Sequence, residues 1–380
     1  MIKRFTVRNF RSLLDVTVDL ADITVLAGRS GTGKTNFVDA LTLLSTIIVH
    51  GSHPTNLSQP LTRFGGSDAF RPANVKSGEF SVEFSVLFAI PGYSDDFDYK
   101  LTARFPNFFV QEESLSHAGK TVFHQKAGKW VQEPKLKGVG ALGTVMLGWL
   151  TGLPEANVAY ISLAKSISSY NFPGTVLASS GSPTPTGPEP LHFDGGNAVQ
   201  VIDGIINSIQ TLPTWQDIES ALKVLSASLI AITVTPFSNS RIGASYQIGE
   251  ELISISLPRQ SEGFRRFLAH LLAIYQNPTP QVILFEEPEK GIFPGALSLL
   301  ADHIKSASSK LGTQFILTTH SPQLLDAFPG EAIRWVKFSP HGTQIAPLAP
   351  DDLLALHEGL MTPGEFLTVT DPSQPEPIKG

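Results

Sequence analysis

Alternation of apolar and polar residues is the clearest pattern in the first part of the chain. It predicts two or three strands within residues 2–26, and the last of them, ITVLAG, is apolar and runs into glycines. From Thr35 to about Val49 the apolar residues instead recur every three or four positions, which is the spacing of an amphipathic helix. The chain therefore begins with strands, a glycine-rich loop and a helix.

Alternation returns in the middle of the chain. The stretch GEFSVEFSVLF, residues 78–88, reads as a strand, and short strand-like runs continue through residues 98–130. We expect these runs to form an antiparallel β layer. Residues 139–170 have a helical pattern, and residues 172–190 hold many Pro, Gly, Ser and Thr residues, which predicts a loop or lid.

Helices and strands alternate in the last part of the chain. The expected elements are helices at about 197–210 and 214–228, strands within 230–257, a helix at 262–275, a strand QVILFEE, a helix at 294–308 and a strand QFILTTH. Strand–helix–strand order at the end predicts parallel pairing. The fold class expected from these patterns is α/β, with a mixed or parallel sheet, an antiparallel β layer and a helical part.

Composition narrows the possible classes of protein. Of the 380 residues, 42% are hydrophobic and 16% charged, which argues against long charged or coiled-coil tracts. The net charge of −6 excludes a protein that is basic overall and binds nucleic acid through that charge. The absence of cysteine excludes disulfides and thiol chemistry. The N-terminus lacks the apolar core of a signal peptide, and residues 139–153 are too short to span a bilayer, so we expect a cytoplasmic protein without a membrane segment.

A phosphate-binding loop is the strongest single motif. GRSGTGKT, Gly28 to Thr35, matches G-x-x-x-x-G-K-[ST] and lies between a predicted strand and a predicted helix, as the motif requires. Its backbone N–H groups and the start of the helix, with about half a positive charge, would surround ATP phosphates. Lys34 should reach the β- and γ-phosphates, and the Thr35 hydroxyl should bind Mg²⁺. The residues expected to contact ATP are Gly28, Arg29, Ser30, Gly31, Thr32, Gly33, Lys34, Thr35 and Asn36.

Two glutamates end the predicted strand QVILFEE. A P-loop enzyme needs one acidic side chain there to hold Mg²⁺, and a second can polarise the attacking water. Adjacent residues of a strand point to opposite faces, so both can serve only if the strand has ended by Glu287, which Pro288 favours. We assign Glu286 to the metal and Glu287 to the water.

Two further motifs stand near the ends of predicted elements. Ser261, Glu262 and Gly263 occupy the start of an amphipathic helix, which offers a second anion-binding site, although Ser-x-Gly before a helix is usually a simple cap. His320 ends the strand QFILTTH, one strand after the acidic pair, where it is a candidate sensor of the γ-phosphate.

The order of these motifs resembles a known family. NFRS near the start, GRSGTGKTN, SEG before a helix, EEPEKG and LTTHSP are similar to the RecF/SMC/OLD-like branch of ABC-type ATPases. More narrowly, they resemble its short bacterial members, known generically as AAA family ATPases. The stretch LHFDGGNAVQVI, residues 191–202, is also similar to that group, and the resemblance extends to about residue 350.

This resemblance implies an ATPase head with a P-loop NTPase fold that works as a head-to-tail dimer of two copies around two Mg·ATP. Residues 261–263 would contact the γ-phosphate held by the other copy. Glu287 would be the catalytic glutamate and His320 the switch histidine, acting with Lys34. Arg11 of NFRS would lie near the nucleotide phosphates.

The sequence departs from the family pattern at several positions. Ser30 stands at the usual asparagine, Phe264 where threonine is frequent, and Phe293 where relatives often have histidine. No glutamine stands out as that of a Q-loop, although Gln59 and Gln111 are candidates. No long heptad run lies between the P-loop and SEG, and no acidic motifs of a TOPRIM nuclease follow the histidine. A separately encoded partner would therefore carry out any cleavage of nucleic acid.

The resemblance also predicts four segments. Residues 1–138 would form an N-terminal ATPase lobe with the P-loop and the β layer, and residues 139–228 a helical insertion that includes the loop 172–190. Residues 229–350 would form a C-terminal ATPase lobe with the signature segment, the acidic pair and the histidine. Residues 351–380 would be a tail.

Three functions remain open at this level. The first is an ATP-controlled dimer that acts on DNA or on a nuclease or toxin effector, in genome maintenance or anti-phage defence, an expectation that rests on family analogy. The second is the nucleotide-binding subunit of a transporter, which the long structured stretch between Lys34 and Ser261 disfavours. The third is a scaffold that binds ATP without turnover. Direct DNA contact would need a local patch, for which the candidates are Arg63, Arg71, Lys76, Lys120, Lys126, Lys129, Lys135 and Lys137.

Overall fold

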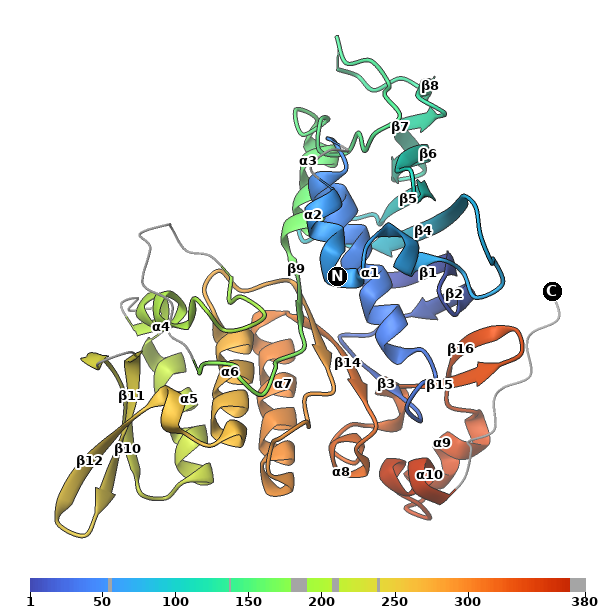
Figure 1. Cartoon of the computed structure of the whole chain (residues 1–380). Helices are drawn as coiled ribbons and strands as arrows, with labels where there is room; N and C mark the ends of the chain where they lie inside the picture. Colours follow the sequence, from blue (N-terminus) through green and yellow to red (C-terminus); the bar gives the residue numbers. More distant parts are fainter. Residues whose placement is uncertain (54–56, 137, 179–189, 207–211, 238–239, 370–380) are drawn as a thin grey trace. The chain divides into compact units, whose positions relative to one another are not determined.

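The computed structural model describes residues 1–53, 57–136, 138–178, 190–206, 212–237 and 240–369 (Figure 1). Contacts divide the chain into two compact units, one formed by Met1–Ser168 with Pro329–Gly380 and one by Ser169–Phe328. The second unit is therefore an internal segment of the chain. None of the described helices is both long and apolar enough to cross a membrane.

The first unit contains a seven-stranded antiparallel sheet in the order β2-β1-β4-β5-β6-β7-β8. Its strands are β1 (Ile2–Phe10), β2 (Leu13–Asp19), β4 (Phe80–Phe88), β5 (Phe97–Phe105), β6 (Phe109–His117), β7 (Lys120–Lys126) and β8 (Lys129–Gln132). Every second side chain of β4 and β5 is buried, as expected for strands with one face on a core. The antiparallel β layer predicted from the sequence is present.

Helix α1, Lys34–His50, packs on this sheet. The Phe37 ring of α1 meets the Phe5 ring of β1 edge to face, with ring centroids 5.4 Å apart. Strand β3, Ile23–Ala27, leads into α1 and pairs in parallel with β15, Ile333–Ser339, which pairs in antiparallel fashion with β16, Gly342–Pro347. The shorter helices of this unit are α2 (Ser58–Leu61), α3 (Pro154–Tyr160), α9 (Pro350–His357) and α10 (Pro363–Val369).

Helix α6, Glu262–Tyr275, is the central helix of the second unit, with the bounds predicted from its amphipathic pattern. It contacts three other helices of the unit, and nine of its fourteen side chains are buried. The surrounding helices are α4 (Ala198–Ile206), α5 (Leu212–Leu225) and α7 (Leu297–Leu311). The predicted helix at 197–210 thus corresponds to α4, and its last residues, 207–210, lie outside the described part of the chain.

Two groups of strands complete the second unit. Strands β10 (Leu229–Phe237), β11 (Ser240–Ile248) and β12 (Glu251–Ser256) form a three-stranded antiparallel sheet. Strands β13 (Val282–Glu286) and β14 (Gln314–Thr319) pair in parallel, with Glu286 opposite Thr318. The end of this parallel pair, followed by the short helix α8 (Pro322–Leu325), carries the predicted site residues Glu286, Glu287 and His320.

The helical prediction for residues 139–170 is wrong over most of its length. Residues 139–153 form turns and irregular backbone, α3 is followed by a π-helical stretch at Ile161–Lys165, and β9 spans Ile167–Tyr170. Glycines at four positions up to residue 152 make a helix there costly, and Pro154 fits the first helical position. Of the predicted loop 172–190, residues 179–189 lie outside the described residues.

Candidate functional site

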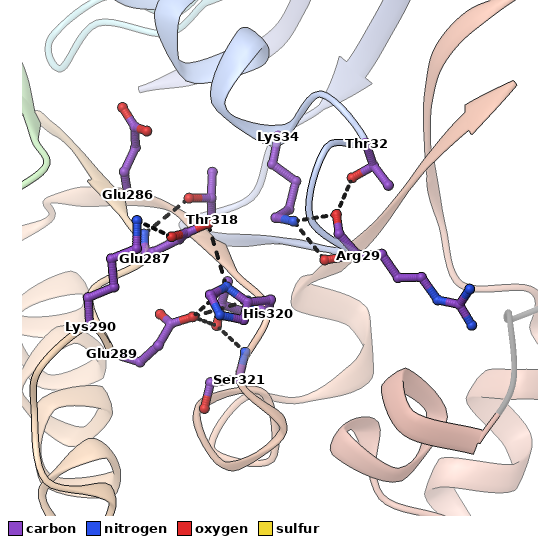
Figure 2. Close-up of polar contacts among 12 residues, drawn as sticks. Arg29, Thr32, Lys34, Glu286, Glu287, Glu289, Lys290, Thr318, His320 and Ser321 are labelled. Carbon is purple, nitrogen blue, oxygen red and sulfur yellow. Dashed lines mark hydrogen bonds and ion pairs between the residues drawn. The ribbon is translucent and has the colours of Figure 1, made fainter.

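The P-loop joins the end of β3 to the start of α1. The Lys34 side chain is only 4% exposed, and its ammonium group donates hydrogen bonds to the carbonyl oxygens of Gly28 (2.6 Å) and Arg29 (2.9 Å) (Figure 2). The Thr32 hydroxyl donates to the same Arg29 carbonyl at 2.9 Å. The loop therefore curls back over the lysine side chain.

Strand β16 contacts this loop through Thr343. The Thr343 hydroxyl donates to the Thr32 carbonyl oxygen at 2.8 Å and lies 2.7 Å from the Ser12 hydroxyl. The Ser12 oxygen in turn accepts a hydrogen bond from the Asn36 amide at 2.7 Å. Gly33 fits here because its φ of 102° is left-handed and because a Cβ would lie 2.1 Å from the Thr343 hydroxyl oxygen.

The start of α1 is suited to an anion. No side chain caps this 17-residue helix, and its first turn holds no acidic residue, so its first N–H groups and the positive end of the helix dipole keep their attraction for negative charge. The Thr35 side chain is exposed there. A buried ammonium group, an uncapped helix start and an exposed hydroxyl together fit a triphosphate with its metal ion.

Arg11 lies at the first turns of α1. Its guanidinium forms an ion pair with Asp39 and donates hydrogen bonds to the Asn36 side-chain oxygen (3.2 Å) and the Ala69 carbonyl oxygen (3.0 Å). Arg11 and Asn36 are thus brought to the base of the P-loop, where Asn36 bridges Arg11 and Ser12. The contact of Arg11 with phosphates stays a prediction.

Strand β13 ends where the two-glutamate hypothesis requires. Glu286 is its last residue, and Glu287 has a left-handed φ of 44°. The Glu287 N–H donates to the Thr318 carbonyl oxygen at 2.9 Å and lies 3.2 Å from the Thr318 hydroxyl oxygen. The two carboxylates therefore diverge, and Glu286 points away from the Glu287 side of the strand (Figure 2). The Asn171 amide lies 3.4 Å from Glu286 Oε2.

The ends of β13 and β14 bring a second set of side chains together. Glu287 forms an ion pair with Lys290, and its Oε1 lies 3.5 Å from His320 Nδ1. The carboxylate of Glu289 lies at the same distance from this ring nitrogen and accepts a hydrogen bond from the Thr319 hydroxyl at 2.8 Å. The His320 side chain is 45% exposed, so the ring is held at the protein surface.

A Mg²⁺ ion at this site would depend on the nucleotide for most of its ligands. Among the described residues, no three His, Asp or Glu side chains gather into a group that could hold a metal ion. The Thr35 hydroxyl of the first unit and the Glu286 carboxylate of the second unit are each an oxygen donor of the kind that Mg²⁺ prefers, because this ion binds few protein oxygens and keeps water and phosphate oxygens as its other ligands. Each residue type is thus compatible with Mg·ATP.

The signature segment begins α6. Ser261 is the N-cap residue, and its hydroxyl oxygen accepts a hydrogen bond from the Phe264 N–H at 3.2 Å. Glu262 pairs with Arg266 at 2.8 Å. A Cβ on Gly263 would lie 2.7 Å from the Gly291 carbonyl oxygen, so only glycine lets the loop after the acidic pair approach this closely.

A cavity of about 770 Å³ lies beside the signature segment. Ser261 and Gly263 contribute to its wall together with Phe264 and Phe293, and Phe293 is 70% exposed. Two of the positions at which the sequence departs from its relatives therefore line one surface next to Ser261.

Some supporting residues were not found by sequence reasoning. Thr343 is 311 residues from Thr32 in sequence, and nothing in the residue pattern points to their contact. Ser12 belongs to the NFRS motif, but no role was predicted for its hydroxyl. Thr318 and Thr319 had a weak signal, because two polar residues close an otherwise apolar strand directly before the histidine. Both side chains are fully buried and hold the backbone and side chains of the acidic loop.

Comparison with protein families gives matches in both halves of the chain. A family described as AAA ATPase domain matches residues 1–82. A second family, an AAA domain whose description names the AbiEii toxin and the type IV TA system, matches residues 214–326. The first range contains the P-loop, and the second contains Ser261, Glu286, Glu287 and His320.

Curated relatives match over a short segment. The DNA replication and repair protein RecF of Rhodococcus erythropolis is 40% identical over 75 residues, which are 20% of this chain and 18% of that protein. RecF of Paenarthrobacter aurescens is 36% identical over 81 residues, or 21% of this chain and 20% of that protein. The matched segment is therefore about a fifth of the length of these relatives.

Solved structures match over nearly the whole chain. An SMC head bound to the C-winged helix domain of ScpA has a TM-score of 0.56 at 15% identity, covering 93% of this chain and 99% of that one. The SMC head of Pyrococcus furiosus with an extended coiled coil, bound to the C-terminal domain of ScpA, has a TM-score of 0.50 at 12% identity, covering 94% and 99%. At these identities the likeness shows the fold. The family matches and the RecF relatives support a RecF/SMC-like ABC-type ATPase, and the fold is that of an α/β P-loop NTPase.

Proposed function

We propose that this chain binds and hydrolyses Mg·ATP and that two copies close around the nucleotide. The observation that carries the proposal is the geometry of the P-loop, in which the buried Lys34 side chain lies under the loop at an uncapped helix start. The Lys34 ammonium group, 4% exposed, donates hydrogen bonds to two backbone carbonyls. It can exchange these neutral acceptors for phosphate oxygens, which carry a full charge.

Each polar group has a separate task in this proposal. Thr35 and Glu286 hold the Mg²⁺, which neutralises charge on the phosphates when bound. Glu287 accepts a proton from the attacking water, and its left-handed backbone turns it away from the Glu286 face. His320 donates a hydrogen bond to the γ-phosphate from its exposed position.

The signature segment supports the pairing of two copies. The Ser261 oxygen accepts the capping hydrogen bond from Phe264, which leaves the hydroxyl proton to be donated to a phosphate oxygen. The start of the fourteen-residue helix α6 adds a positive dipole end. We propose that Ser261, Glu262 and Gly263 meet the γ-phosphate bound to the P-loop of the second copy, in a head-to-tail dimer.

The biological setting is proposed from the relatives. RecF is named for DNA replication and repair, and the second family description names a toxin, which support a role in DNA maintenance or anti-phage defence with a separately encoded effector. Two of the basic candidates for DNA contact have their positive charge offset by a nearby carboxylate, because Arg71 pairs with Asp68 and Lys126 pairs with Glu112. Lys137 lies outside the described residues. We therefore assign DNA contact to an assembled dimer or to its partner.

Phosphate release from Mg·ATP tests the proposal. We expect Glu287→Gln to lower kcat by about 10²–10⁴-fold while Mg·ATP still binds, because only the general base is lost. Lys34→Ala should abolish nucleotide binding itself. Glu133→Gln, on an exposed residue of the first unit, is the matched control and should behave as wild type. Equal and very slow release by wild type and Glu287→Gln would overturn hydrolysis and leave a scaffold that binds ATP without turnover.

A further inference from the structure

Glu289 is the most buried acidic side chain near His320. Its carboxylate is 8% exposed and lies in the loop after β13. One oxygen, Oε1, accepts hydrogen bonds from the Thr319 hydroxyl (2.8 Å) and from the His320 backbone N–H (3.1 Å). The same oxygen lies 3.5 Å from His320 Nδ1 (Figure 2). Three groups at the end of β14 therefore converge on one carboxylate oxygen.

The second oxygen of this carboxylate is buried and lacks a hydrogen-bond partner within the described part of the chain. A buried carboxylate oxygen without a partner is destabilising. A glutamine would satisfy the Thr319 and His320 donors with one neutral oxygen, so stability alone gives no reason for a charged side chain. The charge is explained by the imidazole ring beside it.

We infer that Glu289 is a positioning residue that holds His320 for contact with the γ-phosphate; this inference rests on the proposed function. The Glu289 carboxylate accepts a hydrogen bond from the protonated Nδ1 of His320. The opposite ring nitrogen, Nε2, then faces outward from the cluster. The bonds of Glu289 to the Thr319 hydroxyl and the His320 N–H fix the backbone from which the ring extends. Glu287 lies equally close to Nδ1, but its carboxylate is also paired with Lys290, which leaves Glu289 as the anchor.

Glu289→Gln is the variant that isolates this role. Its amide oxygen can still accept from Thr319 and from the His320 N–H, so the fold is kept while the charged partner of Nδ1 is lost. We expect kcat for phosphate release to fall about 10–100-fold, as for other residues that orient a functional histidine. The affinity for Mg·ATP should be unchanged, because Lys34 and the P-loop are untouched. Glu133→Gln should change neither quantity.

A double-mutant cycle with His320→Ala shows whether Glu289 acts through the histidine. In the His320→Ala background, adding Glu289→Gln should cause no further loss of kcat. If Glu289→Gln lowers kcat by the same factor in both backgrounds, Glu289 acts independently of the ring and the inference is overturned. Unchanged kcat in the single variant overturns it as well.

The ¹⁵N shifts of His320 give a readout that needs no turnover. In full-length protein with labelled histidine, assigned by loss of the signal in His320→Ala, we expect the wild-type ring to carry its proton on Nδ1 and the Glu289→Gln ring to lose this preference. The same tautomer mixture in both proteins would overturn the positioning role. If wild type releases no phosphate but shows this tautomer change, the proposed function fails and the local inference stands.

Discussion

At the scale of the single residue, the contacts around the P-loop explain which of its glycines cannot be replaced. The motif requires a glycine before the lysine, and the structure shows why at this position. Gly33 combines a left-handed backbone with the Thr343 and Ser12 hydroxyls directly where a side chain would begin. Gly31 has a left-handed φ of 80° as well, but apart from its chain neighbours no described residue places an atom within 4 Å of its Cβ position.

The two glycines therefore give a matched test. Gly33→Ala should displace the loop from β16 and abolish Mg·ATP binding, whereas Gly31→Ala should add only about 1–2 kcal/mol of backbone strain and weaken binding modestly. Titration calorimetry with Mg·ATP measures both affinities, and thermal unfolding verifies that both variants fold. Equal affinities in the two variants would show that the contact with Thr343 does not shape the loop.

His270 carries a pH dependence of stability. It is buried in α6 between the Phe172 and Phe285 rings, and its Nδ1 lies 2.7 Å from the Arg266 carbonyl oxygen. Desolvation lowers its pKa from 6.5 to about 4, while the hydrogen bond to the Arg266 carbonyl opposes this shift and the Arg266 charge adds to it. The unfolded chain thus binds this proton at a higher pH than the folded chain does.

The stability from a neutral His270 is therefore complete above about pH 6.5 and is lost as the pH falls toward 4. The loss amounts to about 3 kcal/mol. Urea unfolding of wild type and His270→Leu across this pH range isolates the contribution of His270 to the unfolding free energy, since the other titrating groups are common to both proteins. We expect the difference in unfolding free energy between the two to shift in favour of the variant at low pH, and a constant difference would contradict the assignment.

At the scale of the element, periodicity predicted most of the helices and strands that carry the candidate site residues. The bounds of α6 follow from its apolar face, and the strand before the acidic pair ends at Glu286 because Glu287 leaves the extended region. Residues 139–153 were mispredicted because their apolar residues are separated by glycines, which weaken a helix without changing the apolar spacing. Long-range hydroxyl contacts such as Thr343 with the P-loop leave no local pattern, so sequence reasoning could not find them.

Glu113 of β6 connects several elements through hydrogen bonds that the periodicity of the sequence does not predict. This fully buried carboxylate accepts hydrogen bonds from Tyr99 of β5 (2.9 Å) and Gln125 of β7 (2.9 Å) and from the N–H groups of Met146 (2.6 Å) and Leu147 (3.0 Å). One side chain thus joins three strands to the irregular segment that replaces the expected helix.

Glu113→Ala should destabilise the protein by about 3 kcal/mol or more, because four buried donors lose their acceptor. The adjacent Glu112→Ala is the control, since Glu112 is 39% exposed and pairs with His124 and Lys126 at the surface; we expect it to cost less than about 1 kcal/mol. Chemical denaturation of both variants measures this difference. Equal destabilisation would mean that the buried network is not what ties the irregular segment to the sheet.

At the scale of the whole molecule, the motifs are divided between two compact units. The P-loop belongs to the unit built from both ends of the chain, and the acidic pair, the signature segment and His320 belong to the internal unit. The order of motifs along the sequence predicts an ATPase class, which the AAA family matches support, and the likeness to the SMC head shows the fold. The division into four segments and the pairing of two copies stay proposals.

Mixing two inactive variants tests the central claim most directly. In a head-to-tail dimer, Lys34→Ala removes the P-loop of a site and Ser261→Arg removes the signature of a site, so each variant alone has two defective sites. In a mixed dimer both defects fall on one site and the other is intact. We predict that an equal mixture regains phosphate release to roughly a quarter of the wild-type rate, whereas a mixture as inactive as its two components would contradict the dimer that closes around ATP.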